Sequence, residues 1–291
     1  MRAWAFVSVI VAAVALVGCG GGGIKSDPSG SSIPPGASDT LGTLGTSFDS
    51  NIRQLLAGDE WRYNVTGTAQ KVSEGTSTTV SGTFTTVLSS LQVDFPPDYF
   101  VTGKARVMLE SGSIQGTGFN LIIAERRFFT QGDDRAIIGY GWYNWQAFDP
   151  SKPELHHWAD RAYTVVPSPI DVGTSWETQV LETVTDALGT STINKPFDEH
   201  WVVVDKETLR TLLAGRCIAL KVTGNGRFGG LTAENIDEWW APQVGAPVQV
   251  VMTSTITQTI VDPNTGVETK TDWILRLTYQ LEWTNVARTG S

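Results

Sequence analysis

A regular alternation of apolar and polar residues near the end of the chain is the feature that most constrains the fold. From Trp273 to Trp283 every second residue is large and apolar, and from Arg276 onward the residues between them are polar or charged. A period of two is that of a β-strand, whose successive side chains point to opposite faces. The run therefore predicts a long strand in an antiparallel sheet, with one face buried and the other in water.

Four earlier runs repeat this alternation. Their apolar residues are Trp61, Tyr63 and Val65; Val80, Phe84 and Leu88; Val101, Ala105, Val107 and Leu109; and Val248, Val250, Met252, Ile256 and Ile260. We expect these sets to be buried and the interleaved residues, such as Lys104, Arg106 and Glu110, to face water. The prediction is an all-β, mainly antiparallel fold, built as a curved sheet or half-barrel or as two packed sheets.

Turn and helix signals punctuate these runs. Turns are predicted at 73–76, 131–134 and 262–266, and the last reads as a hairpin with Gly266 in a left-handed conformation. Short helices are predicted at 48–56 and at 205–215, where leucines recur at helical spacing. We therefore expect at most one or two short helices.

The first 18 residues have the pattern of a targeting segment. Arg2 precedes the apolar run Ala5–Val17, whose 13 residues are too few for a membrane span of ~20 residues. The run ends in Leu16-Val17-Gly18-Cys19, which resembles the lipobox of bacterial lipoproteins. That resemblance implies cleavage before Cys19 and attachment of a diacylglyceride, with acyl chains such as palmitate, to its thiol. More than one acyl chain gives stable anchoring to a membrane, and Gly20 favours the outer over the inner membrane of the cell envelope.

The remaining chain divides into a tether and a domain. Residues 19–47 are rich in Gly, Ser and Pro and are predicted to form the lipidated N-terminus and a flexible tether. Residues 48–291 are predicted to form a single β domain. G-x-x-W occurs at 58–61 and again at 173–176, so the domain allows two related halves, about 56–150 and 171–286, joined by a Pro-rich connection at 149–171.

Composition excludes some partners. The net charge is −9, and no stripe of Lys and Arg is present, so nucleic acid is not an expected partner. With Cys19 lipidated, Cys217 is the only other cysteine and has no partner for an intramolecular disulfide. We expect Cys217 to be a small buried side chain.

No common catalytic or metal motif is present, so no enzyme activity, metal or cofactor is expected. His156 and His157 are adjacent and would point apart on an extended chain, which favours a solvated polar loop over a metal site. Asp237 and Glu238 precede two tryptophans, but neighbours on a strand face opposite ways, so both are expected to be surface charges.

Tryptophan is the compositional excess, with 11 residues in the chain. The densest aromatic stretch, at 139–145, has Trp142 opposite Tyr143 and Trp145 if extended. These three and Trp240 are the candidate ligand-binding residues; the alternative is that they fill the core. Glycines at 139 and 141 leave open space beside the rings.

Several stretches together resemble an uncharacterised family of bacterial lipoproteins. They are "LLAGDEWRYNV", "VGTSW", "LLAGRCIALKVTGNG", "DEWWAPQVGAPVQV" and "LTYQLEW", and the resemblance covers most of residues 56–284. The resemblance implies a curved antiparallel sheet, similar to the half-barrels of lipoprotein-localisation factors and mycobacterial lipid-carrier lipoproteins. The leucine run before Gly215 departs from that pattern, because the family has a strand there.

Together these features predict a membrane-anchored, non-enzymatic envelope lipoprotein. Its β domain is expected to bind an apolar or amphiphilic ligand, such as a lipid, or an envelope partner. The alternatives are a glycan-binding module that stacks sugars on the tryptophans and, third, an unrecognised hydrolase.

Overall fold

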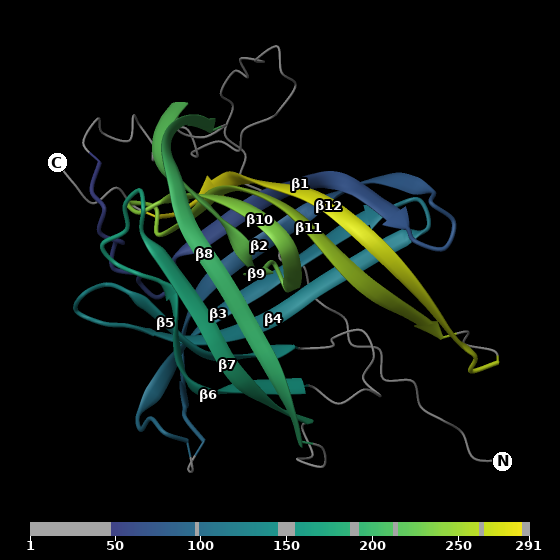
Figure 1. Ribbon diagram of the computed structural model, residues 1–291, viewed down its shortest axis with the longest axis horizontal. Coiled ribbons are helices and arrows are strands. Elements are labelled where there is room, and N and C mark those ends of the chain that lie inside the picture. Colours follow the sequence, from purple (N-terminus) through teal and green to yellow (C-terminus); the bar gives the residue numbers. More distant parts are fainter. Residues whose placement is uncertain are drawn as a thin grey trace, which may run out of the picture. The chain divides into compact units, whose positions relative to one another are not determined.

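The computed structural model describes residues 48–96, 99–144, 155–186, 192–211, 215–261 and 265–286. Twelve antiparallel strands form one closed barrel, in the order β1-β12-β11-β10-β9-β8-β7-β6-β5-β4-β3-β2 (Figure 1). The strands are β1 Glu60–Lys71, β2 Ser77–Asp94, β3 Lys104–Gly116, β4 Phe119–Gln131, β5 Ile137–Asn144, β6 Leu155–Val166, β7 Ser175–Asp186, β8 Thr192–Thr211, β9 Gly215–Phe228, β10 Leu231–Ala241, β11 Ala246–Val261 and β12 Glu268–Thr284. The predicted all-β, antiparallel class is confirmed, and the pairing of β1 with β12 closes the sheet beyond a half-barrel.

The period-two runs do form strands, and most of their apolar faces are buried. The runs in β1, β2, β11 and β12 contribute Tyr63, Phe84, Val250 and Tyr279 to one core cluster. Gly266 has the predicted left-handed backbone, with a φ of 69°, beside the β11–β12 connection. The strict alternation of these strands therefore predicted both their type and their buried face.

Both predicted helices are wrong, and no helix occurs among the described residues. Asp205–Thr211 is part of β8 and pairs with β9, and residues 212–214 lie outside the described residues. Pairing with Gly215–Lys221 of β9 satisfies the backbone of this segment, and this outweighs the helical spacing of its leucines. Residues 48–56 form an extended segment, and the supposed connection at 149–171 contains β6. The described part of the chain thus has no helix with the length and apolarity needed to cross a membrane.

The extended segment 48–58, here called the strap, crosses one end of the barrel. Its backbone hydrogen-bonds two connections and the end of β4: Ile170 N–H donates to Ser50, Arg53 N–H donates to Pro242, and Leu55 N–H donates to the Gln131 side chain. The side chains of its own residues Ile52 and Leu55 are fully buried. The strap therefore closes that end of the barrel with its own apolar side chains.

The hairpin of β9 and β10 projects its tip across the barrel interior. Phe228, at the tip, makes ring contacts with Tyr63, Phe84 and Tyr279 at 5.2–5.9 Å, and these residues lie on β1, β2 and β12. Gly230 follows with a φ of 71° and lies against Ile123 of β4. The tip therefore joins the wall formed by β9 and β10 to the wall formed by β1–β4.

Strand β3 faces the opposite way from the prediction. Met108 and Glu110 lie opposite Arg127 and Glu125 of β4 and point to the interior, so the expectation that Glu110 faces water is wrong. Its apolar set packs on the other face in a second cluster. That cluster comprises Phe95, Ala105, Val107, Phe128, Tyr140 and Tyr143, with Tyr99, Val101, Leu109, Ile138 and Trp158 against it. An outer apolar layer that includes Phe95, Tyr99 and Val101 therefore gave β3 the same alternation as a sheet with one buried face.

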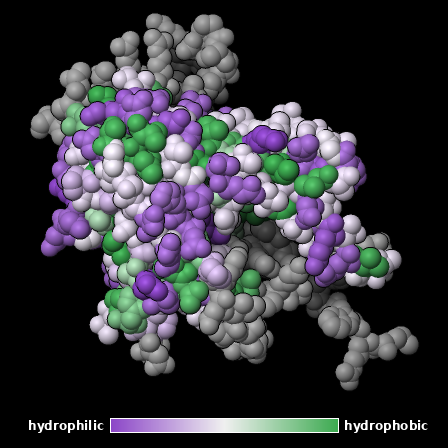
Figure 2. Space-filling model, viewed as in Figure 1, coloured by the Kyte–Doolittle hydropathy of each residue, from purple (hydrophilic) through white to green (hydrophobic). Residues whose placement is uncertain are grey.

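The surface in Figure 2 is mixed. On the face shown, hydrophobic side chains form several separate patches with hydrophilic residues between them. Small separate patches are ordinary for a protein surface and identify no docking site. The search for a site therefore turns to the interior.

Candidate functional site

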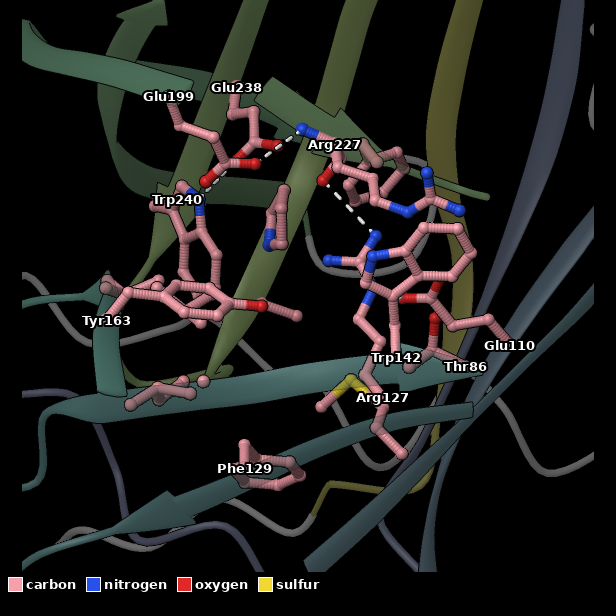
Figure 3. Close-up of a pocket in the computed structure, with 18 of the residues that line it drawn as sticks. Thr86, Glu110, Arg127, Phe129, Trp142, Tyr163, Glu199, Arg227, Glu238 and Trp240 are labelled. Carbon is pink, nitrogen blue, oxygen red and sulfur yellow. Dashed lines mark hydrogen bonds and ion pairs between the residues drawn. The ribbon is translucent and has the colours of Figure 1, made fainter. Parts of the chain in front are cut away.

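A cavity of about 110 Å³ lies inside the barrel, and aromatic side chains form a large part of its wall (Figure 3). Its aromatic lining consists of Trp61, Tyr63, Phe128, Phe129, Trp142, Tyr163, Trp176, Phe197, Trp201, Phe228 and Trp240. Five acidic or basic side chains also line the cavity: Glu110, Arg127, Glu199, Arg227 and Glu238. An apolar cavity with a few converging polar groups is the usual form of a small-molecule site.

Two arginines and two glutamates form one charged cluster at the cavity. Arg127 Nε lies 3.2 Å from Glu110 Oε1 and 3.1 Å from Glu125 Oε1. Arg227 forms a two-nitrogen ion pair with Glu125, whose Nε–Oε1 distance is 3.2 Å. Arg127 Nη2 also donates to the backbone oxygen of Arg227, at 3.2 Å. The cluster therefore fastens the β9–β10 tip to β3 and β4.

The two glutamates of this cluster differ in their acidity. Burial and repulsion by Glu125 raise the pKa of Glu110 to about 7, although Arg127 acts in the other direction. Glu125 is equally buried, but the charges of Arg227 and Arg127 outweigh that burial and hold its pKa below the ordinary value. Glu125 is therefore the carboxylate whose negative charge the arginines stabilise, and the charged form of Glu110 is stabilised less strongly.

Glu199 on β8 and Glu238 on β10 are a second pair of carboxylates in the cavity wall (Figure 3), and the charge of Glu199 acts on Glu238. Each accepts a hydrogen bond from the indole two residues later on its own strand: Trp201 Nε1 donates to Glu199 at 3.3 Å, and Trp240 Nε1 donates to Glu238. Residues two apart share one face of a strand. Both E-x-W sequences thus present a carboxylate and an indole to the interior.

Burial dominates the acidity of this pair. It raises the pKa of Glu199, against the hydrogen bond from Trp201 and the charge of Arg127. It raises the pKa of Glu238 to about 7, against the hydrogen bond from Trp240, with Glu199 adding repulsion. Among the described residues neither carboxylate has an ion pair at 4.0 Å or less.

Both faces of the Trp142 ring are occupied. His157 stacks on it with a centroid distance of 3.4 Å, and the Arg227 guanidinium lies 3.7 Å from its centroid. Two planar groups this close must take opposite faces. Trp142 Nε1 donates to Glu182 Oε1 at 2.7 Å, and His157 Nδ1 lies 3.2 Å from Glu182 Oε2. Trp142 is therefore a fixed part of the wall.

The structure separates the four tryptophan and tyrosine candidates. Trp142 and Trp240 line the cavity. Tyr143 is on the other face of β5, where it belongs to the outer cluster and its ring contacts His156. Trp145 lies outside the described residues, as does the lipidation candidate Cys19.

Two predictions about polar residues are wrong, because both residues are buried. Glu238 is only 6% exposed, since its strand turns it into the barrel, and it is not a surface charge. His157 is in β6 and is buried against Trp142, rather than in a solvated loop. Cys217 is a buried free cysteine, as predicted. Within the ranges that the structure describes, no group of three or more His, Cys, Asp or Glu could hold a metal ion.

Sequence reasoning missed the charged wall, although the sequence does contain a signal for it. E-x-W occurs at both 199–201 and 238–240, next to apolar strand residues. G-x-G at 224–226 is a second signal, because a Cβ on Gly226 would lie 2.3 Å from Trp201 Cζ2. The glycines thus leave room for Trp201 to lie against β9.

Comparison with known proteins gives little. No family model matches the chain, and no curated protein matches it. A "putative exported protein with YmcC-like fold" from Bacteroides fragilis NCTC 9343 is 11% identical, with a TM-score of 0.35, over 81% of this chain and 99% of that one. A "putative lipoprotein" from Parabacteroides distasonis ATCC 8503 is 13% identical, with a TM-score of 0.29, over 81% of this chain and 100% of that one. At these identities and TM-scores, neither protein indicates a function for the cavity.

Proposed function

We propose that this protein is a lipid-anchored lipoprotein of the bacterial cell envelope whose barrel binds a compact amphiphilic molecule in its interior. Anchoring rests on the lipobox-like Leu16–Cys19 at the end of an apolar run. Binding rests on one observation, the cavity whose aromatic wall is interrupted by five ionisable side chains. Rings suit the apolar part of such a ligand, and ionisable groups suit its polar part.

The size and charge of the cavity favour a compact ligand over an acyl chain. Its volume of about 110 Å³ is below the ~300 Å³ at which drug-sized sites begin. It is closer to the ~150 Å³ apolar cavity that holds a benzene molecule. A wholly apolar tail would also cover Glu199 and Glu238 without offering them a hydrogen bond, which is unfavourable.

Binding is favoured over the two alternatives. Trp142 carries His157 and Arg227 on its two faces, so its ring has no free face on which a sugar could stack. Glu199 and Glu238 could suggest the carboxyl pair of a glycosidase, but a hydrolase must also hold the substrate on both sides of the bond that it cleaves. A cavity of this size holds only a molecule smaller than such a substrate.

The test is a titration of the full chain in detergent micelles with three small amphiphiles of similar size: butylammonium, 1-butanol and butyrate. None of them absorbs where tryptophan does, so intrinsic fluorescence and calorimetry can both follow binding. We expect a saturable response to at least one of them. Val165→Phe, which places a ring in the cavity wall, should abolish it, whereas Val251→Phe, on the exposed face of β11, should not.

A response to none of the three in the unaltered chain would overturn the proposed binding function. A saturable response that survives Val165→Phe would show that the molecules bind elsewhere, and it would overturn the assignment of binding to this cavity.

A further inference from the structure

The interior carries more negative than positive charge. Among the described residues, five glutamates with at most 8% exposure point inward: Glu110, Glu125, Glu182, Glu199 and Glu238. Arg127 and Arg227 are paired with the first two. Glu182 contacts His157. Glu199 and Glu238 therefore remain without a cation of their own.

The hydrogen bonds to these two carboxylates come from neutral donors. Glu199 accepts from Trp201 Nε1 and, at 2.9 Å, from the backbone N–H of Arg227. Glu238 accepts from Trp240 Nε1. A buried carboxylate that lacks a cation binds a proton or acquires a positively charged partner, because its desolvation is otherwise uncompensated.

A third acceptor at the same cavity is independent of this pair. Glu110 is 5% exposed and lines the cavity. The backbone N–H of Gly230 acts on this carboxylate, but its buried Oε2 makes no hydrogen bond of full geometry among the described residues. A buried polar atom normally has a partner, so an orphan oxygen at a cavity indicates a ligand that donates hydrogen bonds. The three acceptors lie on β3, β8 and β10, on different parts of the cavity wall.

We propose that the cavity binds a protonated organic amine, whose ammonium group donates to Glu199 and Glu238 and whose organic part lies against the surrounding tryptophan and phenylalanine rings. This inference rests on the proposed binding function and names its ligand class. An ammonium group has up to three donors and one positive charge, and a positive charge is what Glu199 and Glu238 lack.

The aromatic wall favours an organic cation over a metal ion. Ring faces attract ammonium groups through their quadrupole, and cages of aromatic rings are a known means of recognising them. A hard metal ion needs several oxygen ligands at once, and the described residues contain no group of three or more candidate ligands. An anion is disfavoured, because Arg127 and Arg227 are already paired with Glu110 and Glu125.

The three probes of the binding test differ mainly in charge, so they also test this inference. We expect the full chain to bind butylammonium at least tenfold more tightly than 1-butanol, and butyrate more weakly than either. Glu199→Gln and Glu238→Gln should each weaken the binding of butylammonium tenfold or more. The affinity for 1-butanol should change by no more than about twofold. The control Glu177→Gln alters an exposed residue of β7 paired with His200 and should change neither.

A second measurement does not depend on a variant that folds. Calorimetry at pH 6 in buffers of different ionisation enthalpy should show that butylammonium binding releases protons and that 1-butanol binding does not, because the cation replaces protons on the buried carboxylates.

The outcomes separate the two proposals. Saturable binding of 1-butanol or butyrate as tight as that of butylammonium would overturn the amine while leaving the proposed function standing. Butylammonium binding that is unchanged in both Gln variants would also overturn it. If none of the three probes binds, the proposed function itself is overturned.

Discussion

At the scale of single residues, Glu238 shows how the barrel alters the chemistry of one side chain. It is buried, it accepts one indole hydrogen bond, and Glu199 and Glu110 repel its charge. Burial comes first among the causes that raise its pKa to about 7. The folded protein therefore binds the proton of Glu238 over a pH range in which the unfolded chain has released it.

The sign of the resulting pH dependence follows directly. Between the ordinary pKa of 4.5 and the folded value of about 7, the folded state binds more protons than the unfolded state, so the free energy of unfolding falls as pH rises. Glu238→Gln removes this loss. Relative to the unaltered chain, the free energy of unfolding of the variant should increase by up to about 3 kcal/mol between pH 5 and pH 8, at 1.36 kcal/mol per pKa unit.

Urea unfolding at both pH values measures this change. The matched control is Glu177→Gln, on an exposed part of β7, which should shift the free energy of unfolding by less than about 0.5 kcal/mol at either pH. A Glu238→Gln variant whose relative stability is the same at pH 5 and pH 8 would show that the carboxyl group titrates normally.

The sequence predicted single residues of the site only in part. Trp142 and Trp240 were singled out and do line the cavity. Glu238 and Glu110 were assigned to the surface, because a polar residue between apolar ones is normally on the water side of a strand. Here the interior is itself polar, and only the three-dimensional closure of the barrel places Glu110 and Glu238 in one cavity.

At the scale of elements, the β9–β10 hairpin determines how the barrel interior is divided. Its tip carries Phe228 into the aromatic core and Arg227 to Glu125 on β4. Gly229 and Gly230 make the turn with positive φ, which glycine adopts without strain. Gly230 also approaches β4 closely, since a Cβ there would lie 2.7 Å from Ile123 Cγ2.

Two glycines of similar backbone separate strain from packing. Gly75, in the β1–β2 turn, has a φ of 68°, and Gly230 has a φ of 71°, but only Gly230 has a neighbour within 4 Å of a Cβ. Gly75→Ala should cost the strain alone, about 1–2 kcal/mol. Gly230→Ala should cost at least about 1 kcal/mol more, because Ile123 or the hairpin tip must move.

Urea unfolding of the two variants provides the comparison, and the difference between them is the quantity of interest. Equal losses of unfolding free energy in the two variants would mean that the tip moves away from β4 freely and that packing does not hold the hairpin there.

The elements were more predictable than their faces. Alternation of side chains is local and predicted the strands of β1, β2, β11 and β12. It could not predict that β3 has apolar neighbours on its outer side, because Phe95, Tyr99 and Val101 pack against that side. Leucines at helical spacing also led to the wrong prediction of a helix at 205–215. The pairing of this segment with β9 is visible only in the folded structure.

At the scale of the whole molecule, the proposal joins a binding barrel to an anchor that the sequence alone predicts. The two cysteines of the chain test that anchor, because they have different predicted roles. Cys19 ends the lipobox-like segment. Cys217 is a buried free cysteine in β9, and burial raises its pKa to about 11, which leaves it as an unreactive thiol at neutral pH.

We expect the full chain, produced in a bacterium supplied with labelled palmitate, to carry the label and to sediment with the membranes. Cys19→Ser should lose both properties, because without its thiol no diacylglyceride can be attached and no other acyl chain holds the protein. Cys217→Ala should keep both, even if removing a buried sulfur lowers the stability by about 1 kcal/mol. If Cys19→Ser still sediments with membranes after loss of the label, the acyl chains on Cys19 are not what holds the barrel at the envelope.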